Sequence, residues 1–129
     1  METQKHEIKL FDIINNYRKH ENLDGLRYDD AISNVARKHS FDMATGRVAF
    51  GHDGFEDRVK NLSGNQALKI SENVASFQGH PINEEIIAQF WLKSESHLKI
   101  IRGDYQTTGI GIAKGKSNKY FITQLFVQQ

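Results

Sequence analysis

The spacing of the apolar residues changes once along the chain, and this change limits the fold more than any other feature. Up to about residue 93, apolar side chains recur every three or four positions, as they do on one face of a helix. Thr107 to Lys114 instead alternates Gly with Ile or Ala, and Tyr120 to Val127 is aromatic and β-branched. A Gly/Ser/Asn loop at Gly115 to Asn118 lies between them, so the two segments predict a β-hairpin. Helices followed by terminal strands indicate an α+β domain, with helices packed on a small antiparallel sheet.

The helical spacing predicts four helices. They are expected near Glu7 to His20, from a cap at Asp29 or Asp30 to a stop at Thr45-Gly46, from Phe55 to Leu62, and from a cap at Asn83 to about Lys93. Trp91 belongs to the apolar stripe of the last helix. We therefore expect its indole to be buried against the sheet.

The size and charge of the chain exclude several classes of protein. Its 129 residues and 14.8 kDa fit one domain over residues 1–129, and the absence of cysteine leaves the apolar core to stabilise the fold without disulfides. The formal net charge is +1 with no cluster of Lys and Arg, so nucleic acid is not an expected partner. No apolar run approaches the roughly 18 residues of a membrane span. The segment from Met1 to Leu10 is too polar for a signal peptide.

The common catalytic signatures are absent from the sequence. There is no Gly-x-Ser-x-Gly elbow, no His-Glu-x-x-His pair, no phosphate-binding P-loop and no cysteine nucleophile. The Gly109-Ile-Gly111 segment is part of a predicted strand and does not match a dinucleotide-binding turn. These glycines are expected to relieve crowding in the sheet.

Three polar residues remain as candidates for chemistry: His52, Glu72 and His97. Imidazole and carboxylate groups bind metals and exchange protons near neutral pH, so together they would form a site. Each also has a structural interpretation. The two histidines could be helix caps or surface groups, and Glu72 could be a buried carboxylate that ties a loop to backbone N–H groups. Among the other histidines, His39 is expected to be a half-buried core residue, and no function is assigned to the remaining three, which are His6, His20 and His80.

Several short segments, in this order and spacing, resemble the CAP superfamily of cysteine-rich secretory, antigen 5 and pathogenesis-related 1 proteins, also called SCP domains. They are Ile14 to Arg18, Leu26 to Asp29, Ala36 to Ser40 with Met43, Gly51-His52, Ser71 to Ala75, Trp91 to Ser94, Ser96-His97, and Gly109 to Ile112 with Thr123 to Phe126. The resemblance covers nearly the whole chain. The lack of cysteine and the Trp-x-x-Ser-x-x-His arrangement are most similar to the short bacterial branch.

The resemblance implies an α-β-α sandwich, with helices on both faces of a small antiparallel sheet around a central cleft. In many members two histidines and two glutamates line that cleft, and the histidines hold a divalent metal such as zinc. Here His52 and Glu72 match one member of each pair. Ser94 stands where other members carry the second glutamate, and Tyr120 stands where they carry the strand histidine. His97 is expected to take the place of that histidine, so His52 and His97 are the candidate zinc ligands, with weak binding.

The resemblance also implies a function and a location. We expect a bacterial-type protein that is extracellular or anchored to the cell surface, for example as a lipoprotein, with its leader outside the chain given. The expected activity is non-enzymatic: the cleft binds a small or lipidic, sterol-like ligand or a protein partner. The alternative is a metal-assisted, protease-like hydrolase in which Glu72 is the general base for a water held by His52 and His97. A structural domain with a vestigial cleft is the third hypothesis.

Overall fold

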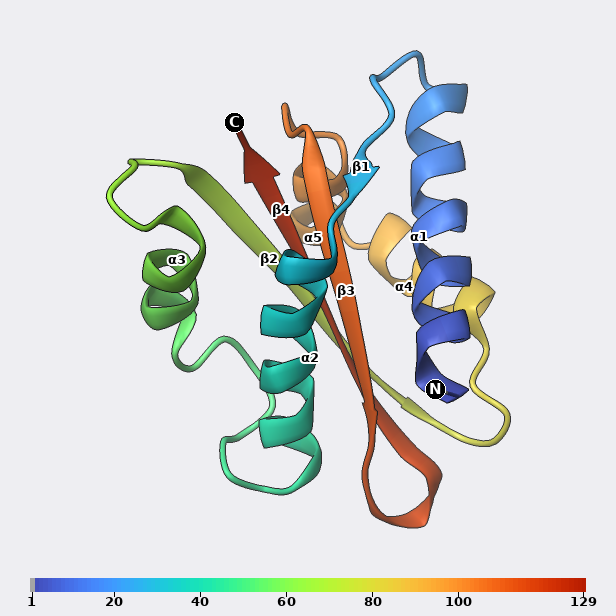
Figure 1. Cartoon of the computed structure of the whole chain (residues 1–129). Helices are drawn as coiled ribbons and strands as arrows, with labels where there is room; N and C mark the ends of the chain where they lie inside the picture. The colour runs from blue at the N-terminus through green and yellow to red at the C-terminus, as the bar shows by residue number, and fades with distance from the viewer. Residues whose placement is uncertain (1) are drawn as a thin grey trace.

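A four-stranded sheet runs through the middle of the molecule in the computed structural model, which describes residues 2–129 (Figure 1). The elements in chain order are α1 (Glu2–His20), β1 (Arg27–Tyr28), α2 (Asp30–Ala44), α3 (Phe55–Ser63), β2 (Lys69–Gln78), α4 (Glu84–Leu92), α5 (Glu95–Ile101), β3 (Thr107–Lys114), the 3-10 turn η1 (Lys116–Asn118) and β4 (Lys119–Gln128). This element content confirms the predicted α+β class.

The strand order is β1-β3-β4-β2. The predicted hairpin of β3 and β4 is present, with Ile112 opposite Ile122. The sequence did not predict β2, which pairs antiparallel with β4 over its full length and places Glu72 opposite Leu125. The two residues of β1 pair parallel with β3 and make the sheet mixed. Because β2 has only one neighbouring strand, it forms an edge of the sheet.

Helices cover both faces of the sheet (Figure 1). One core cluster joins α1, α4 and α5 to the first face through Leu10, Trp91 and Ile101, all fully buried. Trp91 lies at the centre of this cluster, and its indole N–H donates to the carbonyl of Val74 at 3.1 Å, as buried tryptophans require. A second cluster joins α2 and α3 to the opposite face. The expected three-layer sandwich is therefore confirmed.

Two helix boundaries differ from the predicted ones. Helix α1 begins at Glu2 and not near Glu7. The last predicted helix is two helices, because α4 ends at Leu92 and α5 begins after an N-cap at Ser94. None of the described helices combines the length and the apolar character that a membrane span needs.

Two glycines of β3 allow α2 to lie directly on the sheet. A Cβ atom added to Gly111 would stand 2.1 Å from the backbone nitrogen of Arg37, and one added to Gly109 would stand 2.3 Å from that of Ser33. Backbone atoms cannot move aside as a flexible side chain can, so these positions exclude any larger residue. The expectation that the glycines relieve crowding is confirmed.

Candidate functional site

Glu72 is the most enclosed member of the predicted site. It lies on β2, on the sheet face that α2 and α3 cover, and its side chain is only 1% exposed. Arg58 of α3 binds both of its oxygens, with Nε donating to Oε2 at 2.6 Å and Nη2 donating to Oε1 at 2.8 Å. Nδ1 of His52 lies 2.8 Å from Oε1. A buried carboxylate needs such partners, because an unpaired charge away from water is very costly.

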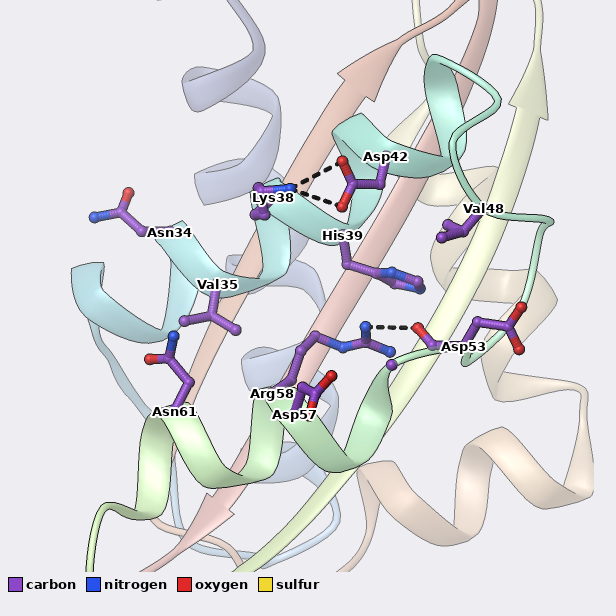
Figure 2. A pocket seen from close by; sticks show the side chains of 11 residues that line it. Asn34, Val35, Lys38, His39, Asp42, Val48, Asp53, Asp57, Arg58 and Asn61 are labelled. Carbon is purple, nitrogen blue, oxygen red and sulfur yellow. Dashed lines mark hydrogen bonds and ion pairs between the residues drawn. The ribbon is translucent and has the colours of Figure 1, made fainter.

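Arg58 also holds the loop that carries His52. Its Nη1 donates to the carbonyl of Asp53 at 2.8 Å, and its Nη2 donates to the carbonyl of His52 at 3.2 Å (Figure 2 shows the bond to Asp53). The guanidinium therefore joins α3, the loop after α2 and the edge strand. Arg58 stands in none of the predicted motifs.

The ring of His52 presents one free nitrogen to solvent. An ionised carboxylate can only accept a hydrogen bond, so Nδ1 of His52 carries the proton that is donated to Glu72. Nε2 makes no hydrogen bond to any residue that the structure describes, and about half of the side chain is exposed. The carboxylate thus orients the imidazole and leaves Nε2 available as an acceptor or ligand.

His97 approaches the same edge from the opposite face of the sheet. It lies on α5, where its Nδ1 is 2.7 Å from Oγ of Ser94 and its backbone carbonyl accepts from the amide of Asn73 at 3.2 Å. Burial lowers the pKa of His97, and the charge of His52 lowers it further. The contact with Asn73, the residue after Glu72 on β2, places His97 at the same strand edge as Glu72.

A groove crosses the edge of β2 beside these residues. It has a volume of about 250 Å³ and is lined by His52, Phe55, Ile70, Ser71, Glu72 and Ile100. Its walls come from α3, from β2 and from α5. The lining is therefore mixed, with Phe55, Ile70 and Ile100 apolar and the other three residues polar.

The structure separates Tyr120 from the other predicted site residues. Tyr120 lies opposite Phe77 on β2, five residues along the strand from Glu72, which corresponds to roughly 16 Å at the usual rise per residue. Its hydroxyl contacts Nδ1 of His80 at 2.9 Å. The structure therefore brings together His52 and Glu72, places His97 and Ser94 at the same edge, and leaves Tyr120 outside.

The histidine pair fits only part of a metal site. Within residues 2–129, no group of three or more His, Cys, Asp and Glu side chains is arranged to hold a metal ion. Glu72 is already bound by Arg58, so the available protein donors are the Nε2 atoms of His52 and His97. Zinc sites in enzymes usually have three protein ligands. Any zinc held here would need further ligands from solvent or from a partner.

No other described histidine lines the groove at the edge of β2. His39 is 3% exposed and not half-buried as the sequence analysis expected, because α2 lies directly on the sheet. Its Nε2 is 2.7 Å from the carbonyl oxygen of Gly51. His6 contacts Glu84 between α1 and α4.

Comparison with known proteins identifies the family. A family model described as CAP, the cysteine-rich secretory protein family, matches residues 11–128. The chain belongs to the CAP family. The comparison with curated proteins gave no match.

Solved structures of two bacterial proteins are similar to this CAP domain over nearly all of its length. An outer surface protein from Borrelia burgdorferi is 25% identical, with a TM-score of 0.77, and the alignment covers 97% of this chain and 94% of that one. An extracellular protein containing an SCP domain from Bacillus anthracis is 28% identical, with a TM-score of 0.80. That alignment covers 98% of this chain and 41% of the Bacillus chain.

The likeness extends to animal proteins at the level of the fold. Venom allergen-like protein 4 from Schistosoma mansoni is 15% identical, with a TM-score of 0.68, and the alignment covers 95% of this chain and 87% of that one. The predicted family and fold are confirmed by these matches. The roles of the individual site residues remain predictions.

Proposed function

We propose that this CAP domain acts outside the cell or on its surface as a non-enzymatic binding protein, and that its partner is a protein docked over the edge of β2 at His52 and His97. The observation that carries the proposal is the state of Glu72. Arg58 holds both carboxylate oxygens from inside the fold, so the group that would have to activate water is committed to an ion pair. The Arg58–Glu72 ion pair orients His52 at the surface, as a binding site requires. It also occupies the carboxylate oxygens that a general base would use.

The size of the groove favours a protein partner over a sterol or another lipid. Pockets for small molecules commonly enclose about 300–1,000 Å³ and bury most of the ligand. The groove at the edge of β2 has about 250 Å³, which suits one inserted side chain. A second hollow of about 550 Å³ is lined only by residues between Asn83 and Lys93, on and beside α4. One helix can cover a lipid on one side only.

An exposed apolar surface continues from His97 along α4. The rings of Phe90 and His97 lie 5.6 Å apart, and Phe90 is 56% exposed, with Ile86 on the preceding turn exposed to a similar extent. Asn83, Glu85, Gln89 and Lys93 surround these side chains. An aromatic centre within a polar rim is the usual anatomy of a protein interface.

The similar bacterial structures support the proposed location. One is an outer surface protein and the other is extracellular by description. A CAP domain without cysteine is compatible with such a location in bacteria, since its core holds the fold without disulfides.

The proposal is tested by placing a photo-crosslinking amino acid at Phe90 and, as the matched control, at Phe41, which is 50% exposed on α2. Crosslinking is carried out in the source cells with the full protein. We expect one discrete adduct from the Phe90 position, absent from the Phe41 position and lost when His97 is changed to Ala. Equal adducts from both positions would contradict the proposal.

One observation favours the hydrolase as a second candidate. Metal-binding histidines usually donate their other ring nitrogen to a carboxylate, as His52 does to Glu72. Bound zinc would act as a Lewis acid beside the groove, with His52 and His97 as its ligands. Hydrolysis of a peptide library with zinc, lost in Glu72→Gln, would establish this function and overturn the binding proposal.

A further inference from the structure

Three connections meet at one end of the molecule, where the turn between β3 and β4 projects beyond the helices (Figure 1). The turn contacts the loop after α2, because a Cβ atom added to Gly115 would stand 3.0 Å from the carbonyl oxygen of Ala44. It also contacts the segment after β2, where the N–H of Gly79 donates to the carbonyl of Asn118 at 3.0 Å. We call this end, formed by residues 45–50, 78–82 and 114–121, the basic tip. None of these three segments contains an Asp or Glu.

The positive charge of the basic tip is not neutralised by neighbouring carboxylates. Lys114, Lys116 and Lys119 are all exposed. The lysine ion pairs within residues 2–129 lie on α1 and α2 instead. The sequence from residue 105 to the C-terminus holds no acidic residue, so the two strands that carry these lysines supply no counter-charge.

Arg47 adds a fourth cation from the loop after α2. Its ion-pair contact is long, with Nε 4.0 Å from Oδ1 of Asp42, and Lys38 holds the same carboxylate more closely, at 2.8 and 3.0 Å. The whole chain has a formal net charge of only +1, so four cations at one end leave the remainder net negative. The field of the molecule is therefore directed, with its positive end at the basic tip.

An exposed aromatic ring lies beside these cations. Phe50 is 53% exposed, and its ring centroid is 6.4 Å from that of Phe121. Nζ of Lys119 lies 5.4 Å from the centroid of the same Phe121 ring. The basic tip thus combines unpaired lysines and an apolar ring on one surface.

This combination favours a membrane as the partner. Lysines close to a bilayer are attracted by anionic headgroups, and apolar side chains between them enter the boundary of headgroups and acyl chains. A projecting turn can meet a flat surface without a rearrangement of the fold. A soluble polyanion would neutralise the lysines but would leave the ring of Phe50 in water.

We propose that the basic tip docks on a lipid bilayer that contains anionic phospholipids, with Lys114, Lys116 and Lys119 at the headgroups and the ring of Phe50 inserted below them. The attachment is peripheral and reversible, because a few cations and one ring bind a bilayer far more weakly than a membrane-spanning helix does. No residue of the basic tip lines the groove at the edge of β2, so the two sites can be tested separately.

The first test is sedimentation of the full chain with lipid vesicles. One set of vesicles contains phosphatidylcholine alone, and the other contains a mixture of phosphatidylcholine and phosphatidylglycerol. We expect binding to the mixture only, and we expect it to fall steeply as salt is added, because salt screens exposed charges. Equal sedimentation with both sets of vesicles would overturn the proposal.

Two matched variants separate the basic tip from attraction to net charge. Lys116→Gln/Lys119→Gln removes two charges from the tip, and Lys60→Gln/Lys99→Gln removes two from exposed positions on α3 and α5. Each lysine near an anionic bilayer is worth about a fivefold change in affinity, so the tip variant should bind roughly 25-fold more weakly. The control variant should bind nearly as the parent does. Equal weakening in both would refute a defined docking surface.

Insertion of the ring is tested with tryptophan as a probe and phospholipids brominated in their acyl chains as quenchers. Phe50→Trp is compared with Phe90→Trp, which lies at an equally exposed position on α4, and the buried Trp91 is common to both. We expect quenching of the added tryptophan in Phe50→Trp only. Soluble polyglutamate is a further arm. Binding to it as tight as to the vesicles, without quenching at position 50, would identify an acidic protein or polymer as the partner and overturn membrane docking.

Discussion

Replacing Arg58 with Met is the most direct test of how the site is built. The substitution keeps a long side chain on α3 but removes the cation that contacts both oxygens of Glu72. Glu72 is 1% exposed and Arg58 is 11% exposed, so water cannot take the place of the guanidinium. His52 would remain as a single, half-exposed neighbour. The variant therefore leaves a buried carboxylate with insufficient compensation.

The size of the effect follows from this burial. Removing one partner of a buried ion pair typically costs about 3–5 kcal/mol of unfolding free energy. At about 2.1 cal/mol/K per residue, a chain of 129 residues has an unfolding entropy of about 0.27 kcal/mol/K. The expected fall in Tm is therefore about 11–18 °C.

Calorimetry or thermal denaturation followed by circular dichroism measures this shift, with two further variants as controls. Arg102→Met removes an arginine from an exposed pair with Glu21, at 2.9 Å, and should change Tm little. The double variant Arg58→Met/Glu72→Gln removes the uncompensated charge and should recover most of the loss. If Arg58→Met shifts Tm no more than Arg102→Met, Glu72 is not held as a buried ion by Arg58 and the reasoning is wrong.

Three further predictions concern the core and the histidines. Trp91→Ala should cost about 3–5 kcal/mol in urea denaturation, because Trp91 is fully buried and bonded to Val74, and an equally stable variant would contradict this. Zinc binding measured by titration calorimetry should weaken as pH falls, since protons compete for the imidazoles. Because burial and the charge of His52 hold the pKa of His97 low, the loss at that ring should begin below the usual value of about 6.5. Binding that survives both His52→Ala and His97→Ala would place the metal elsewhere. The lowered pKa of His39, caused mainly by burial, means that the unfolded chain takes up its proton first. His39 therefore stabilises the fold above a pH of about 6.5, and this contribution should diminish as pH falls further. Urea denaturation of the parent and of His39→Leu at about pH 7.5 and about pH 5 tests this, and an equal pH dependence in both proteins would refute it.

Local sequence patterns were sufficient to predict the elements that have one apolar and one polar face. The sequence of α2 shows a clear apolar stripe and a capping residue, Asp29. In the structure the Asp29 side chain accepts from the N–H of Ile32. Strand β2 has no such alternation. Val74 and Ala75 are both buried, because helices cover both faces of the sheet there, and the polar Glu72 and Asn73 precede them. In a short buried segment that contains polar residues, the spacing of apolar side chains does not distinguish a strand from a helix.

The candidate site was predictable only where a motif carries its residues. His52, Glu72, Ser94 and His97 stand in segments that resemble the family, whereas Arg58 lies in a short amphipathic helix that has no special pattern. Its role depends on α3 packing beside β2, 14 residues along the chain, and no local signal encodes that contact. Tyr120 illustrates the opposite error: alignment with a motif placed it in the site, whereas the register of β2 and β4 moves it away.

The backbone contact between α2 and the two glycines of β3 makes α2 more rigid than α3. Helix α2 is fixed to the sheet at Gly109 and Gly111, so its amides should exchange with solvent only when the whole domain unfolds. Helix α3 contains no fully buried residue, so its amides should exchange faster than those of α2, even though Arg58 ties it to Glu72. The position of α2 is thus constrained by two glycines that lie on another element, so a side chain added at either glycine would displace the whole helix from the sheet.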